Sequence, residues 1–312
     1  MKKISMYFKA ITIILCSFGF NSAFADEPVK LAWTPGPSAP QVAIATEDNL
    51  WKESGVAVTP VSFTSGREAL EALIGQGAGY AIVSEFSAAT ALTRGQDLVI
   101  LASLATYNGN KIIINKKSGA NDIAGLNGKK VGLTIGTQMQ YIFEQVMGDT
   151  KVTYVNVAPS DMPLALIRGD IDAALMFDTF YNQTQLMLGE DYAEVPMLDQ
   201  VNQFLLVSTS NYLKEHQDET FKLIAALKKS DAKVNDTHQV ARYINSALQD
   251  AVSTDNIVKM LPAYHYGVKS ADSALPIMLK EQKWMSDKQL INNQDKKVNF
   301  ADHIDSTYLN SH

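Results

Sequence analysis

Two acidic residues occupy matching places in two similar stretches of the sequence. ALIGQGAGYAIVSEF covers residues 72–86, and ALIRGDIDAALMFDTF covers residues 165–180. Each stretch runs from Ala-Leu-Ile through a glycine-containing turn into a short apolar segment, which reaches Glu85 in the first stretch and Asp178 in the second, 93 positions later. A carboxylate at the end of a strand is often only solvated, but the matched positions favour a shared function. Two such carboxylates could hold an ammonium group or accept hydrogen bonds from the N–H groups of a ligand.

Small polar residues before three predicted helices could bind an anion. They are Ser65 with Gly66, Gly136 with Thr137, and Ser160 with Asp161. A helix N-terminus has unpaired backbone N–H groups and a partial positive charge, which together suit an anion. A Ser or Thr at such a place most often acts only as a helix cap, worth about 1 kcal/mol, so that alternative stays open at each position. Trp33, beside the loop at 34–38, could supply an apolar or cation-facing wall.

Alternating strands and helices are expected to position these residues. The pattern predicts strands at 29–33, 56–63, 80–83, 112–115, 130–134, 152–157 and 171–177, and helices at 40–53, 66–74, 137–147 and 160–167. This alternation predicts an α/β protein with two doubly wound lobes on parallel sheets. A strand at 204–208 is expected to return to the first lobe, and the chain is expected to be helical from 218 to about 290. Because loops at the carboxyl ends of parallel strands line the ligand crevice, Glu85 is expected to face Asp178 across a cleft between the lobes.

The first 25 residues have the three parts of a secretory signal peptide. Three lysines precede an apolar run at 10–20, and an Ala-x-Ala cleavage site ends at Ala25. The run is too short to act as a stable membrane anchor, so we expect cleavage after Ala25 and a periplasmic product. The single cysteine, Cys16, lies within this segment, so the exported protein is expected to need no disulfide.

Composition and missing motifs argue against several classes of protein. The net charge is −6, and the leader contributes only positive charge, so nucleic acid and anionic membrane surfaces are not expected partners. The sequence contains no G-x-S-x-G elbow and no Walker A motif, and its five histidines show no metal-ligand spacing. We therefore expect a monomer that is not an enzyme and that holds no metal and no cofactor.

The chain resembles the periplasmic substrate-binding proteins of ABC importers for nitrate, taurine and aliphatic sulfonates, a family that includes binders of thiamine pyrimidine precursors. The resemblance rests on KLAWTPGPSAPQVAIATEDNLWKESGVAVTPVSFTSG, NDIAGLNGKKVGLTIGTQ and VTYVNVAPSDMPLALIRGDIDAALMFDTF. It implies a periplasmic binding protein type 2 (Venus flytrap) fold, in which two α/β lobes joined by two crossovers close on a small-molecule ligand for delivery to a permease in the inner membrane. The expected divisions are a signal peptide at 1–25, lobe 1 at 26–109, lobe 2 at 110–203, and the return strand with C-terminal helices at 204–312. Hinges are expected near 107–112 and 203–207.

Family binding positions carry over onto twelve residues of this chain. They are Trp33, Ser38, Ser65, Gly66, Ser84, Glu85, Gly136, Thr137, Gln138, Ser160, Asp161 and Asp178. Asp178 falls where many members have Glu in a Trp-Glu-Pro triplet, whereas this chain has Phe-Asp-Thr at 177–179. The resemblance therefore leaves the ligand class open.

A small sulfonate such as taurine is the expected ligand. Glu85, Asp161 and Asp178 would hold its ammonium group, and helix N-termini would hold the sulfonate. A bare oxyanion such as nitrate fits less well, because the acidic neighbours repel it. A pyrimidine or another nitrogen heterocycle stacked on Trp33 is the nearest alternative. Two further alternatives are a pyrimidine-synthase-like enzyme, disfavoured by the missing Cys/His cluster, and a receptor that reports to a membrane signalling protein.

Overall fold

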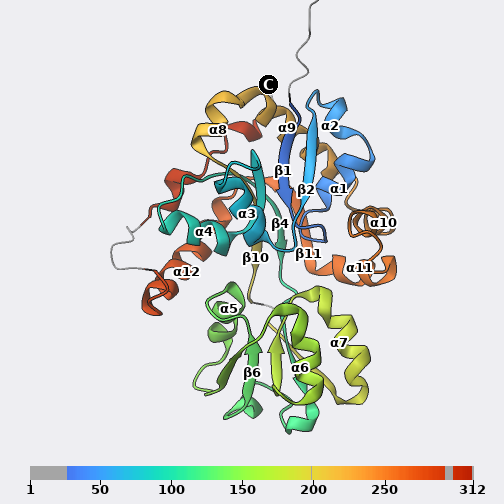
Figure 1. Cartoon of the computed structure of the whole chain (residues 1–312), viewed down its shortest axis with the longest axis vertical. Helices are drawn as coiled ribbons and strands as arrows, with labels where there is room; N and C mark the ends of the chain where they lie inside the picture. The colour runs from blue at the N-terminus through green and yellow to red at the C-terminus, as the bar shows by residue number, and fades with distance from the viewer. Residues whose placement is uncertain (1–26, 198, 292–297, 311–312) are drawn as a thin grey trace, which may run out of the picture.

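The computed structural model describes residues 27–197, 199–291 and 298–310, which form two lobes, one above the other (Figure 1). The expected signal peptide at 1–25 lies outside the described residues. Within the described ranges, no helix is both long and apolar enough to cross a membrane.

A six-stranded mixed sheet forms the centre of lobe 1. In sheet order its strands are β11 (Tyr264–Lys269), β4 (Val99–Tyr107), β10 (Asn202–Ser208), β3 (Tyr80–Ser84), β1 (Val29–Trp33) and β2 (Val58–Ser62). β1 pairs in parallel with β2 and β3, as predicted. β10 is antiparallel to β3 and β4, and β11 is antiparallel to β4, so the sheet is not parallel throughout.

A five-stranded mixed sheet forms the centre of lobe 2. In sheet order its strands are β7 (Thr153–Asn156), β6 (Lys130–Leu133), β8 (Ala173–Leu175), β5 (Lys111–Asn115) and β9 (Tyr192–Pro196). β6 pairs in parallel with β7 and β8, whereas β5 is antiparallel to β8 and β9. The parallel strands are the ones joined by helices, because a parallel connection needs a crossover long enough to return to the same edge.

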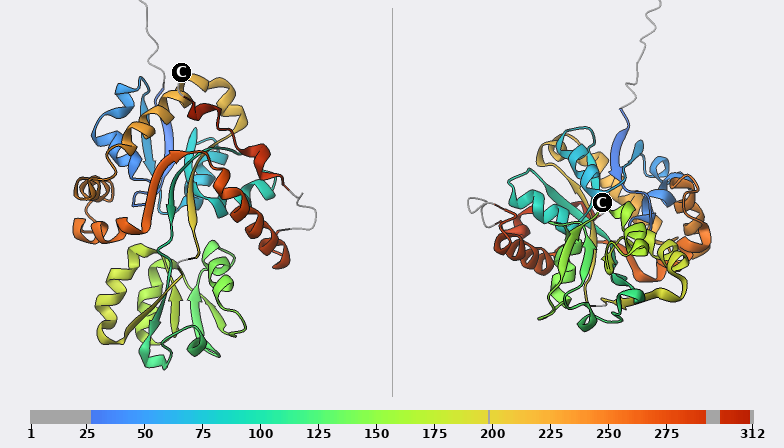
Figure 2. Two further views of the ribbon diagram at one scale, coloured as in Figure 1. Left: turned by 180° about the vertical axis from the view of Figure 1, so that it is seen from behind. Right: turned by 60° about the horizontal axis from the view of Figure 1, so that its bottom comes forward.

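Helices cover both faces of each sheet (Figures 1 and 2). In the first part of lobe 1 they are α1 (Pro40–Glu47), α2 (Leu50–Glu53), α3 (Gly66–Ile74) and α4 (Glu85–Thr93); in lobe 2 they are α5 (Gln138–Val146), α6 (Met162–Arg168) and α7 (Tyr181–Leu188). The C-terminal part adds α8 (Ser210–Glu215), α9 (Gln217–Asp231), α10 (Thr237–Ala247), α11 (Thr254–Met260) and α12 (Leu275–Asp287) to lobe 1.

The prediction that residues 218–290 are helical is wrong at β11. Tyr264 and Val268 are buried there, whereas His265 and Lys269 are exposed. The segment is short and lies between two helices, so its sequence pattern alone predicts a strand only weakly. Pairing with β4 decides its structure, because the ladder satisfies backbone groups that a short isolated helix could not.

One hydrophobic core continues from lobe 1 into lobe 2. It contains residues of α4 and α12 from lobe 1 together with residues of α5 from lobe 2. The rings of Phe86, Tyr141 and Trp284 join the lobes, with centroids 6.4 Å apart for Phe86–Tyr141 and 5.6 Å apart for Tyr141–Trp284. Aromatic pairs at these separations stabilise an interface beyond the area they bury.

The chain passes between the lobes twice. β4 leads through Asn108–Asn110 into β5, and the second passage lies between β9 and β10. The amide of Asn110 donates to the side-chain oxygen of Asn202 at 2.6 Å and so links the two crossovers. The expected second hinge at 203–207 is wrong, because these residues belong to β10 and are paired with both β3 and β4.

We expect Gly109→Ala to destabilise the first crossover. An added Cβ would lie 2.7 Å from the Cβ of Ala263 and 2.7 Å from Cε2 of Tyr107, so the chain would have to shift. Overpacking of this kind typically lowers the free energy of unfolding by about 1–3 kcal/mol. Urea denaturation measures the loss, and Ala263→Gly in the same background should recover part of it. A variant as stable as the parent would contradict the packing argument.

Candidate ligand site between the lobes

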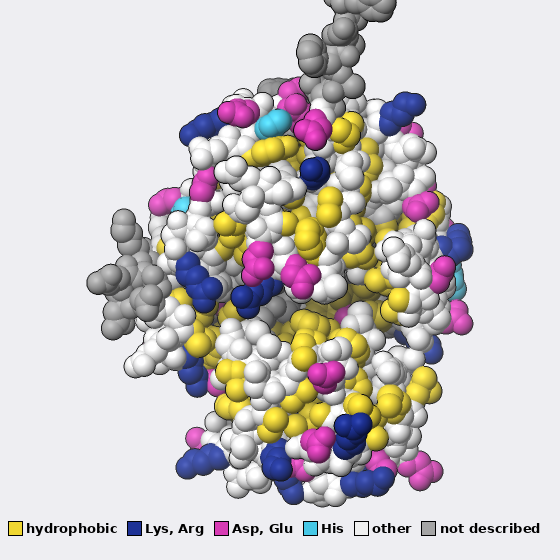
Figure 3. All heavy atoms as spheres, in the orientation of Figure 1, with side chains coloured by type: hydrophobic (Ala, Val, Ile, Leu, Met, Phe, Trp, Pro, Cys, Tyr) yellow, Lys and Arg dark blue, Asp and Glu magenta, His cyan; other side chains and the backbone are white. Residues whose placement is uncertain are grey.

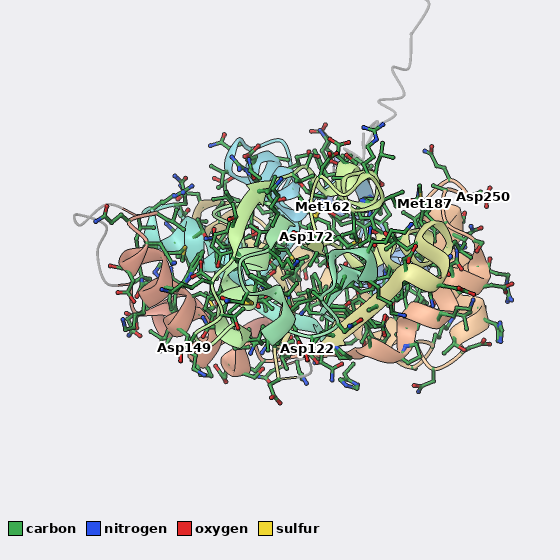
Figure 4. The ribbon with its side chains drawn as sticks, turned by 90° about the horizontal axis from the view of Figure 1, so that it is seen from below. Asp122, Asp149, Met162, Asp172, Met187 and Asp250 are labelled. Atoms are coloured by element: carbon green, nitrogen blue, oxygen red, sulfur yellow. The ribbon has the colours of Figure 1, made fainter. Side chains whose placement is uncertain are left out.

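Strand ends from the two sheets face each other across a hollow (Figure 3). β1, β2 and β3 end toward lobe 2, and β6, β7 and β8 end toward lobe 1 (Figure 1). Ile135 and Phe177, which follow β6 and β8, are 48% and 45% exposed. The loops that lead into β6 and β7, which carry Asp122 and Asp149, lie at the far end of lobe 2 (Figure 4). The exposed apolar side chains at the end of lobe 2 that faces lobe 1 indicate a surface that contacts a ligand or the other lobe.

Asp178 of lobe 2 is held by a tyrosine of lobe 1. Tyr264, the first residue of β11, donates its hydroxyl to Oδ2 of Asp178 at 2.8 Å. Burial raises the pKa of Asp178 to about 6, and the hydrogen bond from Tyr264 offsets part of this rise. The carboxyl group is therefore ionised above pH 6 but can take up a proton in a mildly acidic medium.

Tyrosine rings surround Asp178. The rings of Tyr264 and Tyr107 have centroids 4.5 Å apart, and those of Tyr264 and Tyr266 are parallel within 3° at 6.0 Å. The hydroxyl of Tyr181 accepts a hydrogen bond from the backbone N–H of Lys111 at 3.0 Å. Burial, together with the nearby charge of Asp178, raises the pKa of these tyrosines, so their hydroxyls stay protonated.

The loop after β1 joins the same region. Tyr266 donates its hydroxyl to the carbonyl of Pro37 at 2.9 Å. Trp33 is only 3% exposed and packs in the core of lobe 1, so its ring is not the open wall that the sequence suggested. Its Nε1 and the hydroxyl of Thr34 are nevertheless buried without a hydrogen-bond partner in the described part of the chain. Ser38 is half-buried in the same loop.

Glu85 also makes a hydrogen bond between the lobes. It is 1% exposed, and its Oε1 accepts from the side-chain amide of Gln138 on α5 at 2.7 Å. Its Oε2 accepts from the backbone N–H of Gln203 at 2.7 Å. Burial raises the pKa of Glu85 to about 8, although these hydrogen bonds oppose the rise. Ser84 caps α4 by accepting the backbone N–H of Ser87 at 3.3 Å.

The expectation that Glu85 and Asp178 face each other is wrong. Glu85 follows β3, whereas the partner of Asp178 lies on β11, and the sheet order places β10 and β4 between those strands. Each carboxylate instead contacts the opposite lobe at its own side of the crossovers. The sequence repeat identifies both strand ends, but β10, which separates them together with β4, comes from a later part of the chain.

The helix N-termini at the cleft differ between the lobes. In lobe 1, Ser65 caps α3 by accepting the backbone N–H of Glu68 at 3.3 Å, and Gly66 begins that helix. In lobe 2, Thr137 precedes α5 but donates its hydroxyl to the carbonyl of Thr134 at 2.6 Å, so α5 has no side-chain cap. The backbone N–H of Gly136 donates a hydrogen bond to Oε1 of the Gln140 side chain.

The turn before α6 is exposed to solvent. Ser160 and Asp161 lie in the 3₁₀ turn Pro159–Asp161, and the hydroxyl of Ser160 lies 3.5 Å from Oδ1 of Asp161. α6 and α7 likewise have no side-chain cap. Of these helices, α5 in lobe 2 begins without a side-chain cap for its backbone N–H groups, whereas α3 in lobe 1 is capped by Ser65.

We expect Ser65→Ala to reduce stability without weakening ligand binding. The hydroxyl of Ser65 serves α3, and Glu68 completes the cap by accepting the backbone N–H of Thr64 at 3.1 Å. Loss of an N-cap lowers the free energy of unfolding by about 1 kcal/mol. Thermal denaturation and calorimetry separate the two effects, and Ser65→Asp, which retains a cap, is the matched control. A tenfold loss of affinity with unchanged stability would instead place Ser65 in the site.

The sequence reading missed three residues of this region: Tyr264, Tyr266 and Glu281. A Tyr-x-Tyr alternation in YHYGVK could have indicated the first two. Glu281 lies at helical spacing among Ile277, Met278, Trp284 and Met285, so it occupies the apolar face of α12. A charged residue on an apolar helix face could have indicated from the sequence that Glu281 is buried. No group of three or more metal-ligating side chains occurs within the described ranges.

Comparisons with known proteins agree with this architecture. The NMT1/THI5-like family model matches residues 38–236, and the chain belongs to this family. An aliphatic sulfonates-binding protein of Bacillus subtilis (strain 168) is 23% identical over 99% of this chain and 96% of its own length.

Solved structures share the fold. The periplasmic aliphatic sulphonate-binding protein SsuA of Escherichia coli superposes with a TM-score of 0.75 at 17% identity, covering 89% of this chain and 92% of that one. The alkanesulfonate-binding protein SsuA of Xanthomonas axonopodis pv. citri, bound to MOPS, gives 0.72 at 15% identity over 89% and 97%. The protein thus has the periplasmic binding protein fold. A desulfurization enzyme, DSZB, also has this fold, with a TM-score of 0.67 at 12% identity over 90% of this chain and 97% of the enzyme, so the fold alone does not define the activity.

Proposed function

We propose that this chain is an extracytoplasmic receptor that captures a small polar molecule between its lobes and delivers it to an ABC permease. The observation that carries the proposal is the hydrogen bond from Tyr264 of lobe 1 to Asp178 of lobe 2, which joins the two lobes where their strand ends face each other. A site built from two lobes joined by two crossovers couples ligand capture to lobe closure, which a permease can recognise. The names of the relatives support a binding protein, and the predicted signal peptide at 1–25 supports a periplasmic location. We propose that the receptor is a monomer.

We propose a small sulfonate with an ammonium group as the ligand class. The uncapped N-terminus of α5 offers backbone N–H groups to the sulfonate. Asp178 offers a carboxylate to the ammonium group, and Phe177 and Ile135 offer apolar contact to the carbon chain. The sulfonate-binding relatives support the anionic half of this assignment.

A nitrogen heterocycle is the second candidate. Asp178 can accept a ring N–H, and the rings of Tyr264 and Tyr266 present aromatic surface beside it. The unpaired Nε1 of Trp33 could donate to a ring nitrogen or carbonyl. These three features suit a flat ligand better than they suit an aliphatic one.

Calorimetry with taurine, ethanesulfonate, nitrate and an aminopyrimidine tests the proposal. We expect one of the organic ligands to bind with a dissociation constant near 1 μM, or roughly −8 kcal/mol, and nitrate to bind much more weakly. Native mass spectrometry of the purified protein identifies any ligand that co-purifies. Absence of binding by the whole panel would count against the receptor, and chemical conversion of a bound ligand would favour an enzyme.

A further inference from the structure

A partly open cavity of about 270 Å³ lies away from Asp178, where α12 of lobe 1 approaches α5 of lobe 2. Its walls come from the start of α4, from one face of α5, from the crossover at 199–201 and from α12. Glu85 and Glu281 both line it. Because its walls belong to both lobes, whatever occupies the cavity contacts both.

Glu281 is buried in this wall without a partner. It is 0% exposed, and neither of its carboxyl oxygens has a hydrogen-bond partner among the described residues. The side-chain amide of Gln138 lies near Glu281 and favours the charged form of the Glu281 carboxyl group. This amide nevertheless donates its hydrogen bond to Glu85, at 2.7 Å. Burial, followed by the charge of Glu85, raises the pKa of Glu281 well above its usual range. A buried acceptor of this kind is destabilising unless something supplies a donor.

Three features of the lining favour a donor that is cationic and organic. Glu85, Glu281 and Asp199 are acids, and Lys280 is the single basic residue of the lining. The ring of Tyr141 and the side chains of Ile142, Ile277 and Val201 make the rest of the wall partly apolar. No set of three metal-ligating side chains forms here or elsewhere in the described ranges, so a metal ion is the poorer fit.

We propose that this cavity binds a small primary alkylammonium ion. The three N–H donors of such an ion match the two free oxygens of Glu281 and the remaining lone pairs of Glu85. Its carbon chain would lie against Ile142, Ile277 and Val201, with Tyr141 as an aromatic neighbour of the charge. The site is separate from the proposed ligand site at Asp178, because β10 and β4 lie between them.

A bound ammonium ion would favour the observed arrangement of the lobes. Glu85 and Glu281 belong to lobe 1, and Gln138 and Tyr141 belong to lobe 2. An ion that bridges these groups adds binding free energy only while the two walls are together, so it shifts the population toward this state.

Titration calorimetry of the purified protein with n-butylammonium chloride at pH 8 tests the proposal. We expect saturable binding to the parent protein and a loss of roughly tenfold or more in Glu281→Gln, which keeps the size of the side chain but removes the charge. Asp287→Asn removes an exposed acid from the same helix, away from the cavity, and should bind normally. Tetramethylammonium, which has no N–H donor, should bind at least roughly tenfold more weakly.

Proton release distinguishes the cavity from other amine sites. Binding measured in two buffers of different ionisation enthalpy should show protons leaving the parent protein at pH 7, because Glu85 and Glu281 ionise when they meet the cation. Lys280 and Asp199 also line the cavity, and Tyr141 stays protonated because burial raises its pKa to about 12. This release should persist unchanged in Asp178→Asn and be smaller in Glu281→Gln, in which only Glu85 can release a proton. The proposal is overturned if butylammonium shows no saturable binding, if Glu281→Gln binds it as the parent does, or if Asp178→Asn alone abolishes binding. None of these outcomes depends on whether the Asp178 site binds a sulfonate.

Discussion

Asp178→Ala is expected to weaken the binding of taurine by roughly thirtyfold or more, and that of ethanesulfonate by less than about threefold. The carboxylate would pair with the ammonium group that only taurine carries, and losing one partner of a buried charged pair costs about 2–5 kcal/mol. Calorimetry at pH 8 measures both affinities while Asp178 is ionised, since its pKa is about 6.

The matched control is Asp149→Ala, which removes an acid from the far end of lobe 2 (Figure 4). It should leave both affinities unchanged. Taurine affinity in the parent protein should also fall as the pH drops through 6, because protonation removes the charge of Asp178. Equal losses for taurine and ethanesulfonate would reject the ammonium role, and a loss confined to the aminopyrimidine would favour the heterocycle.

Glu281→Met is expected to stabilise the ligand-free protein at pH 8 by about 2 kcal/mol and to flatten its pH dependence. The parent protein holds protons on Glu85 and Glu281 that the unfolded chain releases near pH 4.5. The free energy of unfolding therefore contains a contribution that is present below pH 4.5 and is lost as the pH rises toward 8. An apolar side chain of similar size at position 281 removes this pH-dependent loss.

Urea denaturation at pH 5, 6.5 and 8, without amines in the buffer, measures this difference. Asp287→Asn should follow the parent profile, because Asp287 is exposed and only pairs with Lys283. A Glu281→Met variant that loses stability at pH 8, or that keeps the parent slope, would show that Glu281 has a partner in solution. Butylammonium should raise the stability of the parent at pH 8 and leave that of Glu281→Met unchanged.

Local patterns in the sequence were enough to locate most of the elements and both acidic strand ends. The repeat around Glu85 and Asp178 predicted β3 and β8, because an apolar run between a glycine turn and a helix start is a local signal that needs no distant partner. Ser65 and Gly66 likewise predicted the start of α3, since a cap is formed by neighbours in the chain. Several such segments together predicted the family, and the match of the family model to residues 38–236 confirms this prediction.

The tertiary structure decided which of these groups meet. β10 and β11 join the lobe 1 sheet from late in the chain, and they place Gln203 beside Glu85 and Tyr264 beside Asp178. The ring of Trp33 is packed in the core of lobe 1. α12 brings Glu281 to α5 across the boundary between the lobes. Such pairings join residues far apart in sequence, and they are selected by packing and backbone hydrogen bonding over the whole sheet, which no short stretch of sequence records.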